Sequence, residues 1–103
     1  MTELAQEEWN ALRLEDENAV LLDVRTQEEY DDKHLIDATL IDIRQPQSFM
    51  SAVQDLPKDK NYYIYCRSGA RSAQACQLLD QLGVSSTYNL QGGILAWTGE
   101  VAL

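Results

Sequence analysis

The segment YYIYCRSGARS (Tyr62–Ser72) places a cysteine, Cys66, between two stretches of different periodicity. The four residues before the cysteine are aromatic or β-branched, which is typical of a buried strand. The stretch SAQACQLLDQL (72–82) repeats its apolar residues at helical spacing. The sequence therefore predicts a strand, then a short loop that begins with a thiol, and then a helix.

The loop CRSGARS (Cys66–Ser72) has the composition of an anion-binding site. Gly69 permits the backbone angles that turn several N–H groups toward one point. The helix N-terminus contributes partial positive charge, and Arg67 and Arg71 contribute full charges. Such surroundings lower the pKa of a cysteine and make its thiolate reactive. The alternative is a buried cysteine beside an ordinary turn, but two arginines, a glycine and a helix start coincide in this one loop.

The size and charge of the chain limit what it does. Its 103 residues leave no room for a second core, so we expect a single domain over residues 1–103. The formal net charge of −9 argues against nucleic acid or an anionic membrane surface as a partner. The basic cysteine loop is therefore an exception within an acidic protein.

Cysteine usage and the first residues predict a cytoplasmic protein with reduced thiols. Two cysteines, Cys66 and Cys76, are too few for a secreted disulfide scaffold. Residues 1–12 are acidic and interrupted by polar side chains, which argues against a signal peptide. No apolar stretch approaches the roughly 20 residues that a membrane helix requires.

Predicted strands and helices alternate along the chain. Thr26 and Glu29 have the spacing of a capping box, and Pro46 is suited to open a helix. The expected strands are 19–24, 40–43, 62–65 and 87–90, and the expected helices are 3–14 with Thr2 as N-cap, 26–32, 46–56, 72–82 and a short one at 94–97. This alternation indicates a parallel sheet between helices. Ligands of such sheets bind at the carboxyl ends of the strands, where the cysteine loop falls.

Five motifs follow one another along the chain: LLDVR (Leu21–Arg25), EEY (Glu28–Tyr30), HLI (His34–Ile36), YCRSGARS (Tyr65–Ser72) and QGGILAW (Gln91–Trp97). Their order and spacing resemble a rhodanese-type sulfurtransferase domain over nearly the whole chain, from about Val20 to Trp97. The resemblance implies an α/β fold, a three-layer α/β/α sandwich whose five-stranded parallel sheet has the order 3-2-4-5-1. It also implies a cysteine that carries a sulfane sulfur as a persulfide, with no cofactor.

The residues of the loop suit this chemistry. A Cys66 thiolate would attack the outer sulfur of a donor such as thiosulfate, and cyanide or a thiol would then remove the sulfur. We expect the N–H groups of Arg67 through Arg71 to converge on the terminal sulfur of the persulfide. Arg67 and Arg71 are candidates for holding an anionic donor. The predicted substrate-binding loop is Arg67, Ser68, Gly69, Ala70, Arg71 and Ser72.

Two other functions remain as alternatives. One is a sulfur-relay or binding module that takes sulfur from a persulfide-bearing protein, and the net charge of −9 favours it modestly because it repels small dianions. The other is a phosphatase or arsenate reductase, whose loop resembles C-x5-R. Here Cys66 to Arg71 is C-x4-R, a tighter ring that suits a single sulfur, and no general acid is evident near the loop. The physiological donor and acceptor and the oligomeric state stay open.

Several residues outside the loop have two interpretations. Asp23 and Arg25 correspond to residues that support the loop in the family, and Glu29 is the expected partner of Arg25. The alternative for these three residues is capping and ion pairing without a catalytic part. Cys76 is a small buried hydrophobe or a resolving thiol, and the first is favoured. His34 is expected to be structural, and no metal site is expected because the chain has no other histidine.

The segment after His34 departs from the family pattern, which resembles H-I-x-G-A-x-N-I-P. Asp37 stands where that pattern has glycine. The missing glycine suggests a changed turn before the second strand.

Overall fold

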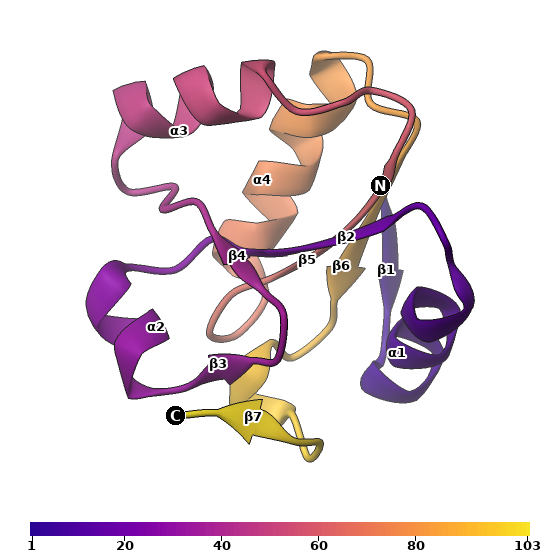
Figure 1. The fold of residues 1–103 in the computed structure, drawn as a ribbon, viewed down its shortest axis with the longest axis vertical. Coiled ribbons are helices and arrows are strands. Elements are labelled where there is room, and N and C mark those ends of the chain that lie inside the picture. The colour runs from indigo at the N-terminus through magenta and orange to yellow at the C-terminus, as the bar shows by residue number, and fades with distance from the viewer.

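The computed structural model describes all residues, 1–103, and its centre is a five-stranded parallel sheet (Figure 1). The strands are β1 (Thr2–Leu4), β2 (Ala19–Asp23), β4 (Thr39–Leu40), β5 (Asn61–Tyr65) and β6 (Ser86–Leu90). Their order across the sheet is β1-β6-β5-β2-β4. Counted in chain order from the β4 edge, this is 3-2-4-5-1, so the predicted topology is confirmed.

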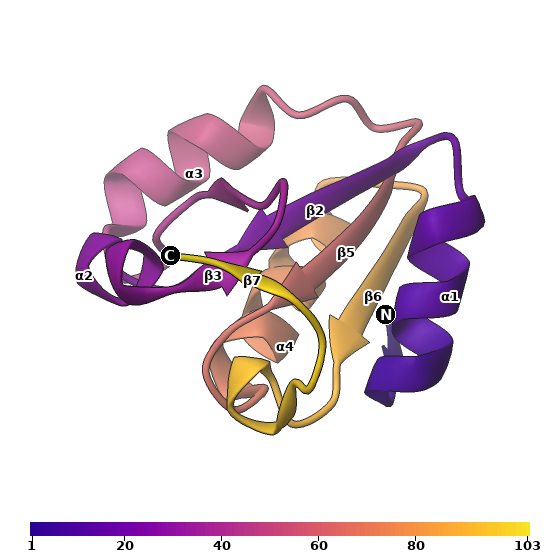
Figure 2. The same ribbon diagram turned by 60° about the horizontal axis from the view of Figure 1, so that its bottom comes forward.

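Helices cover both faces of the sheet, as Figure 2 shows. The helices are α1 (Gln6–Glu15), α2 (Gln27–Asp32), α3 (Pro46–Gln54), α4 (Ala70–Gln81) and the short 3-10 helix η1 (Ile94–Ala96). One core cluster joins the sheet to α3 and α4, and a second joins the opposite face to α1 and η1. The fold is therefore the expected three-layer α/β/α sandwich.

Alternation along β5 explains why the central strand is apolar throughout. Tyr62 and Ile64 enter the core on the α3 and α4 side, whereas Tyr63 and Tyr65 enter the core on the α1 side. Successive side chains of a strand point to opposite faces, so a strand covered on both faces has no polar side. The strand ends at the carboxyl edge of the sheet, directly before Cys66.

The prediction for the first residues was wrong. Thr2–Leu4 form an edge strand, in which Leu4 pairs with Leu90 of β6, and α1 begins only at Gln6. Thr2 therefore caps no helix, and Ala5 stands at the N-cap without a side-chain bond. Three residues are too short to show a strand period, and pairing with β6 decides their conformation.

Two further segments differ from the predicted elements. The strand expected at 40–43 is shorter, although the N–H groups of Ile41 and Ile43 still donate to Asp23 and Val24 of the neighbouring chain segment. A two-stranded antiparallel ribbon was not predicted; it joins β3 (His34–Leu35) to β7 (Val101–Ala102). None of the helices has the length and apolar character needed to span a bilayer.

Candidate active site

Cys66 lies between the end of β5 and the start of α4, at the carboxyl edge of the sheet. Its residue surface is only 1% exposed. Gly69 is the N-cap of α4 with φ 114°, the left-handed region that favours glycine. The helix begins at Ala70, so Arg71 and Ser72 belong to its first turn. The predicted loop is therefore partly helical, and the free N–H groups of a helix N-terminus lie beside the thiol.

Two hydrogen-bond donors reach the sulfur of Cys66. The backbone N–H of Gly69 donates to Sγ at 3.0 Å, and the hydroxyl of Ser72 lies 3.3 Å from Sγ. Burial raises the pKa of the Cys66 thiol, but hydrogen bonds from Ser72, Gly69 and Ser68 outweigh burial and hold that pKa below its ordinary value. The site is thus arranged to stabilise a thiolate.

The guanidinium of Arg71 is already paired and is not free to bind a ligand at the site. Its two terminal nitrogens bind both carboxylate oxygens of Glu29, at 2.8 and 2.9 Å. This two-point ion pair ties the first turn of α4 to α2. It also holds the pKa of Glu29 down to about 2, with the hydrogen bonds from Arg71 as the largest cause. Arg67 is exposed and has no ion-pair partner, so it is the arginine of the loop that remains available.

The expected pairing of Arg25 with Glu29 was wrong. Arg25 binds Asp23 instead, with its Nε and a terminal nitrogen 2.6–3.1 Å from the carboxylate oxygens. Side chains two residues apart on an extended chain point to the same side, so the side chain of Arg25 lies beside that of Asp23. The hydroxyl of Tyr65 donates to the same carboxylate at 2.6 Å. Tyr65 is the last residue of β5 and directly precedes Cys66, so this buried group supports the end of the strand that presents the thiol.

The glycine pair after β6 allows a second chain segment to touch the loop. The N–H of Ile94 donates to the carbonyl of Cys66 at 2.9 Å, and that of Leu95 donates to the carbonyl of Arg67 at 3.0 Å. A Cβ on Gly93 would lie 2.6 Å from the carbonyl oxygen of Cys66 and closer still to Arg67. Gly93 is therefore required for this contact between the two segments.

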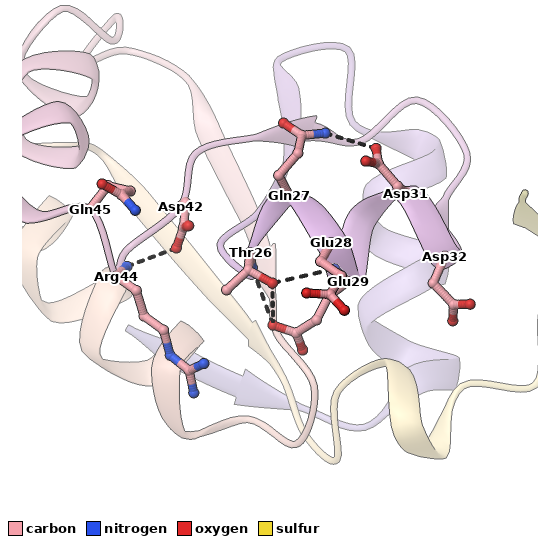
Figure 3. A pocket seen from close by; sticks show the side chains of 9 residues that line it. All are labelled: Thr26, Gln27, Glu28, Glu29, Asp31, Asp32, Asp42, Arg44 and Gln45. Atoms are coloured by element: carbon pink, nitrogen blue, oxygen red, sulfur yellow. Dashed lines mark hydrogen bonds between the residues drawn. The ribbon is translucent and has the colours of Figure 1, made fainter.

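A small depression of about 170 Å³ lies beside the loop. Its lining combines cationic side chains with acidic and apolar ones: Arg25, Lys33, Arg67, Glu29, Asp32, Ile94 and Leu95. A larger and more open depression lies over α2 and the segment before α3 (Figure 3). It is lined by five acidic side chains and one arginine, Arg44. An anionic donor is repelled there, so the smaller depression is the better candidate for donor binding.

Asn89 is a site residue that the sequence interpretation missed. Its side chain is fully buried on β6, and its Oδ1 lies 2.5 Å from the hydroxyl of Ser72. Its amide nitrogen donates to Glu3 at 3.0 Å and to the carbonyl of Gly69 at 3.2 Å. The available signal was a polar amide inside the predicted strand 87–90, because a buried amide needs hydrogen-bond partners.

The remaining candidates lie outside this group. Cys76 is fully buried on α4, and burial raises the pKa of its thiol to about 12. His34 stacks on the ring of Tyr30 at 3.7 Å and bonds to the Tyr30 carbonyl, which agrees with a structural role. No group of three or more His, Cys, Asp or Glu side chains is placed to hold a metal ion.

Comparison with known proteins identifies the family. The model of the Rhodanese-like domain family matches residues 6–100. The chain belongs to the rhodanese-like domain family. A crystal structure of a rhodanese-like domain protein from Staphylococcus aureus superposes with a TM-score of 0.82 at 30% identity, covering 97% of this chain and 94% of that one. The fold of this rhodanese-like chain therefore agrees with that of its structural relative.

Several relatives carry functional names, among them the following two. A sulfurtransferase from Allochromatium vinosum is 38% identical over 97 residues, which cover 94% of this chain and 88% of that protein. A tRNA uridine(34) hydroxylase from Teredinibacter turnerae is 31% identical over 103 residues, which cover 97% of this chain but 32% of that protein. The rhodanese-like family and the sulfurtransferase relative together support a sulfur-transfer role.

Proposed function

We propose that this rhodanese-like domain is a sulfurtransferase that carries a sulfane sulfur on Cys66 as a persulfide. The proposal rests on the surroundings of the Cys66 thiol. The residue is 1% exposed, yet the N–H of Gly69 and the hydroxyl of Ser72 lie within hydrogen-bonding distance of its sulfur. Donors that converge on one sulfur favour its anionic form. The two free thiols, Cys66 and Cys76, suit a reducing compartment such as the cytoplasm.

The proposed reaction has two displacement steps. The Cys66 thiolate attacks the outer sulfur of thiosulfate, the S–S bond of the donor breaks, and sulfite leaves with the electron pair of that bond. The product is Cys66–S–S⁻, and the total charge is unchanged. Cyanide or a thiolate then attacks the terminal sulfur, which restores the Cys66 thiolate. No general base is needed, because the nucleophile is already ionised when it reacts.

The geometry favours a sulfur donor over a phosphate ester. The nearly buried Cys66 admits only a narrow reacting end, such as the terminal sulfur of a thiosulfate or a persulfide. Arg71 closes the C-x4-R loop but is held by both oxygens of Glu29, so it is not free to bind phosphate oxygens. The burial of Cys66 and the pairing of Arg71 thus favour a sulfur donor, as the length of the loop also does.

The donor is a small anion in this proposal, and Arg67 is the residue that attracts it. Arg67 follows Cys66 directly and lines the small depression together with Lys33 and Arg25. Arg25 is neutralised by Asp23, which leaves Arg67 as the unpaired charge nearest in sequence to the thiol. A guanidinium offers forked donors that match a sulfonate group.

A sulfur relay between proteins is the second candidate. The lining of the acidic depression over α2 (Figure 3) includes Glu29, which binds Arg71 of the loop. An acidic surface near the site repels small dianions and attracts a basic protein partner. In this version a persulfide-bearing protein replaces thiosulfate, and Cys66 keeps the same role.

The mass of the intact protein tests the proposal. After brief incubation with thiosulfate, the wild type is expected to gain about 32 Da, the mass of one sulfur, and cyanide is expected to reverse the gain. Cys66→Ala should show no gain, whereas the matched control Cys76→Ala should behave as the wild type. A gain that persists in Cys66→Ala would refute the assignment. A wild type that stays unmodified with thiosulfate but gains the sulfur from a protein persulfide would select the relay.

A further inference from the structure

The hydroxyl of Ser72 has three acceptors within reach but only one proton. Its Oγ lies 3.3 Å from the Cys66 sulfur, 3.2 Å from the carbonyl oxygen of Gly69 and 2.5 Å from Oδ1 of Asn89. A serine hydroxyl donates one hydrogen bond and accepts others. The acceptors therefore compete, and Asn89 makes the shortest contact.

The orientation of the Asn89 amide is fixed by its other partners. Its nitrogen faces the Glu3 carboxylate at 3.0 Å and the Gly69 carbonyl at 3.2 Å, and both of these groups only accept. If the nitrogen and oxygen of the amide were exchanged, Oδ1 would face the Glu3 carboxylate and the Gly69 carbonyl, and none of these three oxygens carries a proton. Oδ1 must therefore face Ser72, and the Ser72 proton must lie on the line between them.

Competition for this proton links Asn89 to the charge of Cys66. While Ser72 donates to Asn89, its Oγ presents a lone pair to Sγ, which suits a neutral S–H but not a thiolate. When Cys66 ionises, Ser72 must turn its proton to the sulfur, and the buried Oδ1 of Asn89 then faces a second oxygen without a proton. A buried acceptor that loses its donor costs free energy.

We propose that Asn89 is a positioning residue that competes with Cys66 for the Ser72 proton and so offsets part of the stabilisation that the site gives to a charge on Sγ. Two forms of the residue do not need this proton at Sγ: the thiol and, resting here on the proposed function, the persulfide, in which the negative charge moves to the terminal sulfur. The N–H of Gly69 still stabilises the thiolate, but Ser72 contributes less than it would without this competition. The persulfide is therefore stabilised relative to the thiolate.

The charged groups around Cys66 do not account for the same effect. On α4, Arg71 interacts with Cys66 but is paired with Glu29 of α2. At the end of β2, Arg25 is paired with Asp23. Glu3 on β1 lies behind Asn89, and Arg67 is exposed beside the thiol. Substitution of Asn89 by an apolar residue changes none of these charges.

Titration of the Cys66 thiol tests the proposal without any sulfur donor. In a Cys76→Ala background, the ultraviolet absorbance of the thiolate gives the pKa of Cys66, and the pH dependence of its alkylation rate gives a second reading. Asn89→Leu is expected to lower that pKa by about one, which raises the thiolate fraction roughly tenfold at pH values well below the pKa. Asn89→Val, which suits a strand, serves if the leucine variant does not fold.

The effect must pass through Ser72, and this separates positioning from a general structural change. In a Ser72→Ala background, Asn89→Leu should leave the pKa of Cys66 unchanged. Glu3→Gln, which keeps an acceptor for the Asn89 amide and removes the charge, should reproduce little of the shift. An unchanged pKa in the folded Asn89 variants, or an equal decrease without Ser72, would overturn the proposal. A persulfide that never forms would refute the proposed function and leave this result standing.

Discussion

The two cysteines of this chain share one hydrophobic cluster and differ in chemistry. Cys66 and Cys76 are 1% and 0% exposed, and both pack against the α3 and α4 side of the sheet. Burial raises the pKa of Cys76 to about 12, whereas the pKa of Cys66 lies below its ordinary value. Burial alone therefore does not decide the state of a thiol in this protein.

The difference comes from the backbone around each sulfur. Cys76 lies within α4, where the N–H groups are used in the helix, and the hydroxyl of Thr87 is the one donor that lowers its pKa by hydrogen bonding. Cys66 precedes the same helix, where the first N–H groups have no helical partner. Gly69 supplies one of them to Sγ at 3.0 Å. Position relative to the helix N-terminus separates a reactive thiol from an inert one.

Alkylation is expected to show this contrast at its largest. At pH 7 a thiol with a pKa of about 12 is ionised in roughly one molecule in 10⁵, whereas an ordinary thiol is ionised in a few per cent. Cys66 should therefore react with iodoacetamide at least about a thousandfold faster than Cys76. Peptide mass spectrometry after a short exposure measures both rates in one sample. Comparable labelling of the two residues would remove the distinction.

A disrupted loop should make Cys66 resemble Cys76. Gly93→Ala places a Cβ against the carbonyl groups of Cys66 and Arg67, so the loop must shift away from the segment that holds it. We expect sulfur transfer to fall by roughly a hundredfold, as misplacement of a reacting group does, and the pKa of Cys66 to rise. Transfer rate and thiolate absorbance measure the two effects.

Gly83→Ala is the matched control for this substitution. Gly83 also has a positive φ, 89°, but a Cβ there meets nothing within 4 Å. Its cost is limited to backbone strain of about 1 kcal/mol, with no loss of transfer. If both alanine variants lost the same activity, general destabilisation and not the contact with the loop would explain the result.

The ion pair between Arg71 and Glu29 secures the first turn of the helix that serves Cys66. The pKa of Glu29 in the folded protein, about 2, lies below its ordinary value of 4.5. Folding thus favours the ionised carboxylate, and the stabilisation is complete above pH 4.5 and is lost as the pH falls toward 2. With its partial exposure taken into account, the contribution is about 2 kcal/mol.

Glu29→Gln tests this contribution by urea unfolding at pH 7 and pH 3. The variant should be less stable than the wild type at pH 7, and this difference should narrow to less than half at pH 3. Asp31→Asn on the exposed side of α2 is the control and should change stability little. A gap between Glu29→Gln and the wild type that stays constant from pH 7 to pH 3 would contradict the assigned pKa.

Local patterns predicted most of this fold, and long-range partners were the part that sequence could not supply. The capping box at Thr26 and Glu29 is present as predicted, because its two residues lie within one turn. The edge strand Thr2–Leu4 was missed because β6, more than 80 residues away, determines it. A turn is present where the family pattern has glycine, and Asp37 in that place takes a φ of 73°.

The same distinction between local patterns and long-range contacts applies to the site. The position of Cys66 before a helix could be predicted from adjacent residues. The partner of Glu29 and the role of Asn89 could not be predicted, because both depend on contacts between distant segments. For Arg25 the sequence neighbour two positions away was the correct partner.

The smallest expected effect concerns Cys76 and completes the comparison. If this thiol only fills space, Cys76→Ala removes one sulfur from the buried face of α4 and should cost about 1 kcal/mol of stability, as small core truncations do. Sulfur transfer by Cys66 should stay at the wild-type rate, measured in the same preparation as the unfolding free energy. A loss of transfer in a variant that remains folded would show that Cys76 receives the sulfur, and the two cysteines would then act as a pair.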